Sequence, residues 1–133
     1  MEIVTAIGNI NINEDDIITF KTGILGFEHL MPWGLVKSEE EGLSWLISLE
    51  DENIAFILWH IQEYLSDYTI SGYDLDRHQS VYTILTIRNE KITANLVAPI
   101  IIDVEKHTGS QFIMTESGYS TQTLLYTRED EKC

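Results

Sequence analysis

Short runs of β-branched and aromatic residues recur about every eight to twelve residues along this chain, separated by acids, asparagines and glycines. This spacing is typical of an all-β sandwich or barrel, built mostly from antiparallel strands. The runs predict about ten short strands, at residues 2–7, 9–13, 17–20, 33–37, 43–49, 54–59, 81–88, 93–103, 111–116 and 120–127. Because no repeat or linker divides the chain, we expect a single β domain over residues 1–128 and an acidic tail at residues 129–133.

One segment departs from the strand pattern and predicts a short helix. Four of its apolar residues have the spacing i, i+3, i+4 and i+7 of one helical face: Ile61, Tyr64, Leu65 and Tyr68. A second short turn is expected at "YDLDRHQ", with Leu75 as its apolar anchor. Neither segment is long enough to be stable alone, so both are expected to pack on the sheet.

The chain is strongly acidic, with 22 acids against 8 bases and a formal net charge of -14. Nucleic-acid binding draws its affinity from clustered lysine and arginine, and the bases here form no cluster. A basic protein partner would instead be attracted by such a field. With 44% hydrophobic and 10% aromatic residues, the composition is that of a folded domain rather than a disordered regulator.

The acids are concentrated in four triplets between or beyond the predicted strands, at residues 14–16, 39–41, 50–52 and 129–131. If the strands between residues 17 and 49 form an antiparallel meander, the first two triplets lie at one end of the sheet. The third then lies at the other end, roughly 23 Å away. This predicts acidic loops at two ends rather than one acidic patch. The alternative is that each triplet only keeps its turn soluble.

Patterns for catalysis or metal binding are scarce. Four histidines lie far apart, and none has H-x-x-x-H or H-E-x-x-H spacing: His29, His60, His78 and His107. There is no G-x-S-x-G elbow and no Walker loop. The one cysteine, Cys133, is the last residue and permits neither an intramolecular disulfide nor a thiolate cluster. We expect no catalytic residue, metal or cofactor, with an enzyme site in a barrel mouth as an alternative.

The sequence also bears on the compartment. Its N-terminus, "MEIVTAIGNI", has no positively charged leader region, and its apolar runs are far shorter than the roughly 20 residues that span a bilayer. A single cysteine fits a reducing environment. We therefore expect a cytoplasmic protein without a membrane partner.

The stretch "KTGILGFEH" at residues 21–29 raises the question of phosphate binding. KH domains clamp nucleic-acid backbones with a G-x-x-G loop, because glycine amides approach phosphate closely. In a chain of this charge, Gly23 and Gly26 are better explained as turn residues, with Phe27 anchoring the turn to the core. The alternative function is a small single-stranded nucleic-acid-binding barrel. Three tryptophans would then be stacking platforms instead of core residues: Trp33, Trp45 and Trp59.

Two apolar stretches, at residues 56–60 and 93–103, place constraints on the sheet. "FILWH" is continuously apolar, so either both of its faces are covered or one is exposed. In "TANLVAPIIID", Pro99 cannot donate to a ladder and implies an edge or a bulge. Asn95 needs hydrogen-bond partners if it is buried.

The order of these motifs resembles the flagellar assembly factor family, FliW. Its elements are F-x-x-G-[IL]-P-G-F-E, then N-L-x-A-P before three aliphatic residues, then a late G-x-Q followed by a tyrosine. The first element corresponds here to Phe20, Gly23, Ile24, Gly26, Phe27 and Glu28. The second corresponds to Asn95, Leu96, Ala98, Pro99 and residues 100–102. The third corresponds to Gly109, Gln111 and Tyr119. Leu25 replaces the usual proline, and residues 59–61 replace a Ser-Pro-aromatic turn.

The resemblance implies a β-barrel-like binding protein without catalysis. Family members bind flagellin in the cytoplasm and, once flagellin is exported, bind the RNA-binding translational repressor CsrA, which relieves repression of flagellin synthesis. An acidic domain suits a basic partner such as CsrA and does not suit RNA. The candidate partner-binding residues are Gly23, Leu25, Gly26, Phe27, Glu28, Asp51, Glu52, Trp59, Asn95, Pro99 and Tyr119.

Overall fold

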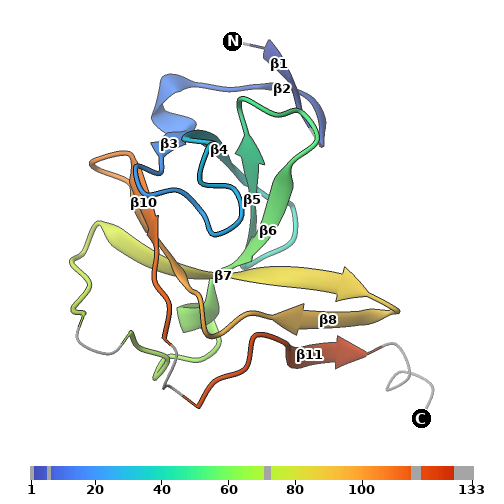
Figure 1. Cartoon of the computed structure of the whole chain (residues 1–133), viewed down its shortest axis with the longest axis vertical. Coiled ribbons are helices and arrows are strands. Elements are labelled where there is room, and N and C mark those ends of the chain that lie inside the picture. Colours follow the sequence, from blue (N-terminus) through green and yellow to red (C-terminus); the bar gives the residue numbers. More distant parts are fainter. Residues whose placement is uncertain (1, 6, 71–72, 115–117, 128–133) are drawn as a thin grey trace.

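The computed structural model describes residues 2–5, 7–70, 73–114 and 118–127. These residues form eleven strands and two 3-10 helices (Figure 1). The strands are β1 (Glu2–Thr5), β2 (Gly8–Asn11), β3 (Ile17–Thr19), β4 (Pro32–Lys37), β5 (Leu43–Ser48), β6 (Ala55–Trp59), β7 (Gln79–Arg88), β8 (Lys91–Ala94), β9 (Ile100–Asp103), β10 (Thr108–Gln111) and β11 (Thr123–Thr127). The helices are η1 (Glu14–Asp16) and η2 (Ile61–Glu63).

Seven strands close into a barrel in the order β3, β4, β5, β6, β7, β9 and β10. The meander from β3 to β7 is antiparallel throughout, and β9 pairs antiparallel with both β7 and β10. The ring closes where β10 meets β3 in parallel, through the single pair Thr108 and Thr19. The expectation of a mostly antiparallel, barrel-like all-β fold with short helices is therefore confirmed.

The strand β7 is 10 residues long, which is enough to pair with one set of strands in the barrel and with another set outside it. Its first four residues pair with β9 and help to close the barrel. Its last four residues pair with β8, which in turn pairs with β11. In Figure 1 these three strands extend together beyond the barrel, and β1 and β2 form a separate hairpin at the opposite end of the view.

Neighbouring residues on the barrel strands face two different cores, as the alternation of strand side chains requires. Ile100 and Ile102 of β9 pack in the inner core, whereas Ile101 between them packs in the outer core. On β6, Leu58 lies in the inner core and Trp59 packs against the outer one. The inner core comprises Ile18, Phe20, Ile24, Leu30, Trp33, Leu46, Leu58, Tyr82, Ile100 and Ile102, and the outer core comprises Ile61, Tyr68, Ile70, Val81, Ala94, Leu96 and Ile101. The stretch at residues 93–103 is thus covered on both faces, whereas in the stretch at residues 56–60 only Leu58 is fully buried.

The short helix predicted at residues 61–68 is confirmed only at its start, because η2 (Ile61–Glu63) is the helical part, and the predicted apolar face does not form. Helix η2 ends after one turn, and the chain then follows an irregular path. Ile61 and Tyr68 are buried, but Tyr64 is 52% exposed and Leu65 is 41% exposed. The hydroxyl of Tyr68 donates to the carbonyl of Leu96 at 2.7 Å, so a side chain rather than a helical backbone anchors this segment to the outer core. A turn does follow at residues 76–79, and Leu75 packs against the outer core.

The single strand expected over residues 93–103 is also wrong, because β8 and β9 are separate. Between them, the Oδ1 atom of Asn95 accepts from the N–H groups of Val97 and Ala98 at 3.1 and 3.2 Å, which turns the chain. Pro99 lies outside both strands, where its missing N–H breaks no ladder. The strand expected at residues 111–116 instead lies at 108–111, and residues 115–117 are outside the described part of the chain.

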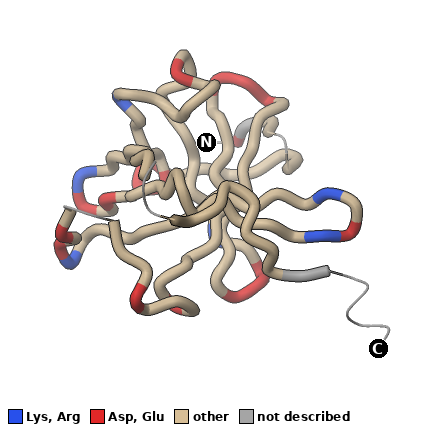
Figure 2. Tube along the Cα trace, turned by 60° about the horizontal axis from the view of Figure 1, so that its bottom comes forward, with Lys and Arg blue, Asp and Glu red and all other residues tan. Residues whose placement is uncertain are grey.

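The strand registers place the described acidic triplets as the meander predicts. Lys37 pairs with Ser44, so the β4–β5 turn that holds residues 39–41 lies at one end of β5. Residues 50–52 follow β5 at its other end, and η1 leads into the start of β3. Figure 2 shows acids on loops around the whole molecule. The expected acidic tail at residues 129–133 lies outside the described residues.

Among the residues that the structure describes, no helix is long and apolar enough to cross a membrane.

Candidate functional site

The G-x-x-G stretch forms a tight turn over residues 24–27. The N–H of Phe27 donates to the carbonyl of Ile24 at 2.6 Å, and Gly26 has a φ of 89°. A positive φ at the third residue is the mark of a type II turn, which favours proline at the second residue. Leu25 occupies that second position, where a proline would also fit the backbone. The turn forms here with leucine, and glycine supplies the positive φ.

The backbone amides of this turn are already used within the protein. The N–H of Gly26 donates to Glu28 Oε1 at 2.8 Å, and that of Leu25 donates to Gln111 Oε1 at 2.8 Å. The N–H of Gly23 donates to the carbonyl of Phe20 at 3.1 Å. A phosphate would have to displace these acceptors, and it would also meet the Glu28 carboxylate. The arrangement therefore favours the structural interpretation of the G-x-x-G stretch over a phosphate clamp.

The charge state of Glu28 is tied to the same turn. Because the Gly26 N–H donates to its carboxylate, the pKa of Glu28 is lowered from its ordinary value. The lowered pKa means that the ionised form is the one that stabilises the folded turn. This contribution is present at neutral pH and is lost as the pH falls through the lowered pKa.

Gln111 joins two motifs that are far apart in the sequence. Its side-chain oxygen accepts from Leu25, which is 86 residues away, and its side-chain nitrogen donates to the carbonyl of Ala98 at 3.3 Å. The following segment pairs with the same stretch, because Phe112 N–H donates to Pro99 O at 2.9 Å. We call residues 23–28, residues 95–99 and Gln111 the motif junction. It contains seven of the candidate residues: Gly23, Leu25, Gly26, Phe27, Glu28, Asn95 and Pro99.

The motif junction combines a buried anchor with an exposed apolar edge. The ring of Phe27 meets that of Phe56 edge-on, with centroids 5.2 Å apart, and packs against the inner core. Leu25 is 70% exposed and Ile113 is 50% exposed. Both line a shallow groove of about 190 Å³ together with Thr22, Gly23, Glu28 and Gln111. The groove therefore places two exposed apolar side chains beside polar ones.

The other four candidate residues do not join this site. Asp51 and Glu52 lie in the β5–β6 turn, whose Glu50 carboxylate accepts from the Met31 N–H at 3.2 Å and so borders the end of the long β3–β4 loop. The ring of Trp59 stacks on Tyr64 at 5.4 Å, and that of Tyr119 lies 5.1 Å from Tyr68. The candidates therefore occupy several places on the surface rather than one.

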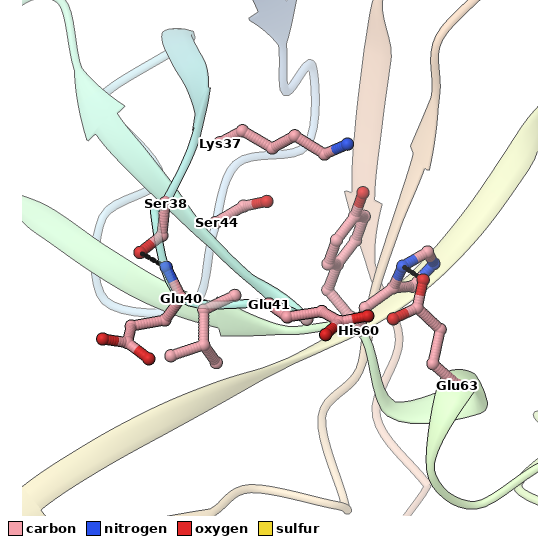
Figure 3. A pocket seen from close by; sticks show the side chains of 10 residues that line it. Lys37, Ser38, Glu40, Glu41, Ser44, His60 and Glu63 are labelled. Atoms are coloured by element: carbon pink, nitrogen blue, oxygen red, sulfur yellow. Dashed lines mark hydrogen bonds and ion pairs between the residues drawn. The ribbon is translucent and has the colours of Figure 1, made fainter.

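A larger cleft of about 520 Å³ opens at the mouth of the barrel (Figure 3). Among its lining residues, Ser44, Glu63 and Tyr82 were not singled out from the sequence. They come from β5, η2 and β7, so no short motif brings them together. Across the part of the chain that is described, no group of three or more His, Cys, Asp or Glu side chains is placed to hold a metal ion.

Comparison with known proteins gives consistent matches along the chain. The family model described as FliW protein matches residues 3–125. The chain is 40% identical over 130 residues to the flagellar assembly factor FliW of Clostridium botulinum (strain Alaska E43 / Type E3), covering 89% of this chain and 92% of that protein. It is 36% identical to the flagellar assembly factor FliW of Thermosipho africanus (strain TCF52B), covering 94% of this chain and 95% of that protein.

A solved structure is similar as well. The crystal structure of a flagellar assembly factor FliW superposes on this chain with a TM-score of 0.81 at 32% sequence identity. The similarity covers 97% of this chain and 99% of the other. The likeness therefore extends to the whole barrel and its extension, not to a single motif.

Proposed function

The chain belongs to the FliW family of flagellar assembly factors, and from this we propose that it binds flagellin in the cytoplasm and antagonises the translational repressor CsrA. When flagellin is exported, the freed protein binds CsrA, so that flagellin synthesis follows export. The protein acts by binding and carries out no catalysis. The observation that carries the proposal is the motif junction, where two stretches of the family pattern meet on Gln111.

The electrostatics of the chain support a basic protein as one of the partners. The net charge of -14 is spread over loops around the molecule (Figure 2). Such a field raises the rate of encounter with a basic RNA-binding protein and opposes RNA itself. The internal use of the Gly23, Leu25 and Gly26 amides argues in the same direction.

Flagellin is assigned to the apolar groove of the motif junction. Leu25 and Ile113 are exposed there, whereas the neighbouring Gly23 and Ile24 are buried. The buried residues hold the exposed apolar side chains in place. An exposed apolar side chain beside polar groups is typical of a protein contact. Asp51, Glu52, Trp59 and Tyr119 stay predicted contacts for either partner.

The purified protein should form a saturable complex with flagellin and another with CsrA from the same organism. Raising the salt from 50 to 500 mM is expected to weaken the CsrA complex about tenfold or more, because screening shortens the reach of the acidic loops. The flagellin complex should change far less, since apolar contact is insensitive to screening. Isothermal titration at both salt concentrations measures both effects. Absence of binding to either partner at micromolar concentration would defeat the proposal.

The substitution Leu25→Ser is expected to affect the binding of flagellin but not the binding of CsrA. It removes the exposed apolar side chain and keeps the N–H that donates to Gln111, so the fold should be preserved. Flagellin affinity is expected to fall about tenfold, with CsrA affinity unchanged. The matched control is Ile87→Ser on β7, where the side chain is 62% exposed but lies outside the junction. Equal losses from both substitutions would contradict the assignment of flagellin to this groove.

A further inference from the structure

The barrel-mouth cleft has the dimensions of a binding site and is not part of the motif junction. Its volume of about 520 Å³ is within the range of roughly 300–1,000 Å³ that ligand sites occupy. Three acids and one lysine line it, so its charge is negative at neutral pH. The lining residues are Lys37, Ser38, Glu40, Glu41, Gly42, Leu43, Ser44, His60, Glu63 and Tyr82.

Two largely buried residues, Ser44 and Tyr82, line the cleft where it meets the inner core and present their hydroxyl groups to it. Ser44 shares a face of β5 with Leu46, and Tyr82 is itself a member of that core. Each residue is only 9% exposed, yet neither side-chain hydroxyl has a hydrogen-bond partner among the described residues. Burial raises the pKa of Tyr82, and the charge of Glu63 raises it further, so the phenol is neutral at pH 7. A ligand with N–H donors would satisfy the lone pairs of both hydroxyls.

Two carboxylates approach the cleft from different sides. In Figure 3, Glu41 and Glu63 both extend toward His60, whereas Glu40 points away from them. Glu63 Oε1 lies 3.0 Å from His60 Nδ1, and the ring of His60 stacks on Tyr82 with centroids 4.9 Å apart. The cleft thus presents carboxylate oxygens beside a flat ring pair.

The acidic turn at the rim is held in place before any ligand arrives. The N–H of His60 donates to the carbonyl of Gly42 at 2.9 Å, and the hydroxyl of Tyr64 donates to that of Glu41 at 3.2 Å. The turn also closes on itself, because Leu43 N–H donates to Glu40 O at 3.2 Å. A preorganised rim binds with less loss of conformational entropy than a mobile one.

We propose that this cleft binds the guanidinium group of an arginine side chain presented by a basic protein partner. A guanidinium carries five N–H donors in one plane, which matches carboxylates and hydroxyl acceptors and stacks on flat rings. Lys37 is the one lysine or arginine among the described residues that line the cleft, and its charge opposes such a ligand. The inference rests on the proposed function for the identity of the partner, which would be CsrA, but the chemistry of the cleft is testable without it.

The direct test is an NMR titration of the full chain with N-acetyl-arginine amide. Saturable shifts are expected at Gly42, Leu43, Ser44 and Tyr82. The neutral isostere N-acetyl-citrulline amide should bind about tenfold more weakly, because it lacks the charge that the carboxylates bind. Equal binding of citrulline, equal binding of N-acetyl-lysine amide, or shifts spread over the whole molecule would each overturn the assignment.

Variants of the carboxylates and the lysine test the geometry. The double substitution E41Q/E63Q should weaken arginine binding about tenfold or more. E40Q and the double substitution E50Q/E52Q are controls, because Glu40 points away and the other pair lies at the far end of β5. K37M should tighten binding by removing a like charge. Equal losses of arginine affinity in the controls would show that only the general negative field of the protein attracts arginine. Weaker arginine binding by K37M would show that the cleft prefers an anion. Either outcome would defeat the proposal.

Tyr82→Phe tests the unpartnered hydroxyl. Stability should be unchanged, because this hydroxyl has no hydrogen bond to lose, while arginine affinity should fall about threefold. Tyr68→Phe is the matched control: its hydroxyl donates to Leu96, so the variant should lose stability but keep its arginine affinity. Unchanged affinity in Tyr82→Phe would contradict the assignment.

The same variants then decide the role of the cleft toward CsrA. If CsrA binds, E41Q/E63Q should weaken the complex about tenfold more than E50Q/E52Q does. Equal losses would overturn the cleft as the CsrA contact. If the unaltered protein fails to bind CsrA, the proposed function fails, and the arginine titration still decides whether the cleft recognises a guanidinium.

Discussion

Replacing Gly23 by alanine is expected to lower the free energy of unfolding by about 3 kcal/mol or more. Gly23 has a φ of 77°, a conformation that side chains disfavour, and a Cβ built there would overlap the Cα of Glu28. Because the overlap is with backbone, it can be relieved only by opening the turn that carries the motif junction. Urea denaturation followed by tryptophan fluorescence measures the loss.

Gly26→Ala is the matched control for that substitution. Gly26 has a similar φ of 89°, but no atom lies within 4 Å of a Cβ built at that position. Gly26→Ala should therefore lower the free energy of unfolding by about 1–2 kcal/mol, the cost of the backbone conformation alone. Equal losses at the two glycines would mean that the close approach of Gly23 to Glu28 contributes nothing.

Gly109→Ala is expected to cost about 3 kcal/mol for a purely steric reason. Gly109 lies in β10, next to the seam with β3, and a Cβ there would overlap the ring of Phe20. That ring is fully buried and meets Trp33 edge-on, with centroids 6.4 Å apart, so it has little room to move. Thermal and urea unfolding should both report the loss.

A double-mutant cycle isolates this contact. Phe20→Leu in the Gly109→Ala background should cost less than Phe20→Leu alone, because the smaller side chain relieves the overlap. Ser110→Ala, one residue along the same strand, should change stability by no more than about 0.5 kcal/mol. Strict additivity of the two substitutions would contradict the steric explanation.

Most of the fold could be predicted because its signals are local. Strands β3, β5 and β6 coincide with the predicted runs to within one residue at each end. The division between β8 and β9 was not predicted because residues 96–98 between them are apolar, although Asn95 and Pro99 are turn signals in the sequence. The helix is shorter than predicted, because the end of the segment is anchored by the side chain of Tyr68, a tertiary contact that overrides periodicity.

The candidate site was only partly predictable, since its decisive contacts join distant residues. The G-x-x-G pattern fits a phosphate clamp and a structural turn equally well. What distinguishes them is the acceptor of each amide, and for Leu25 that acceptor is Gln111, 86 residues away. Apart from the acidic triplet at residues 39–41, the cleft gave little sequence signal, because Ser44 and Tyr82 are brought to it only by the pairing of β5 with β6 and of β6 with β7.

That closure has a consequence for how the chain folds. Short connections at residues 38–42 and 49–54 join β4 to β5 and β5 to β6, so these pairings can form early from nearby segments. The seam between β10 and β3 instead brings together Thr19 and Thr108, which are far apart in the sequence. Closing this long loop costs much chain entropy, and only a single strand residue pair forms there. We expect the seam to form last and to open first, so that the inner core is most accessible to water along this one line of the barrel.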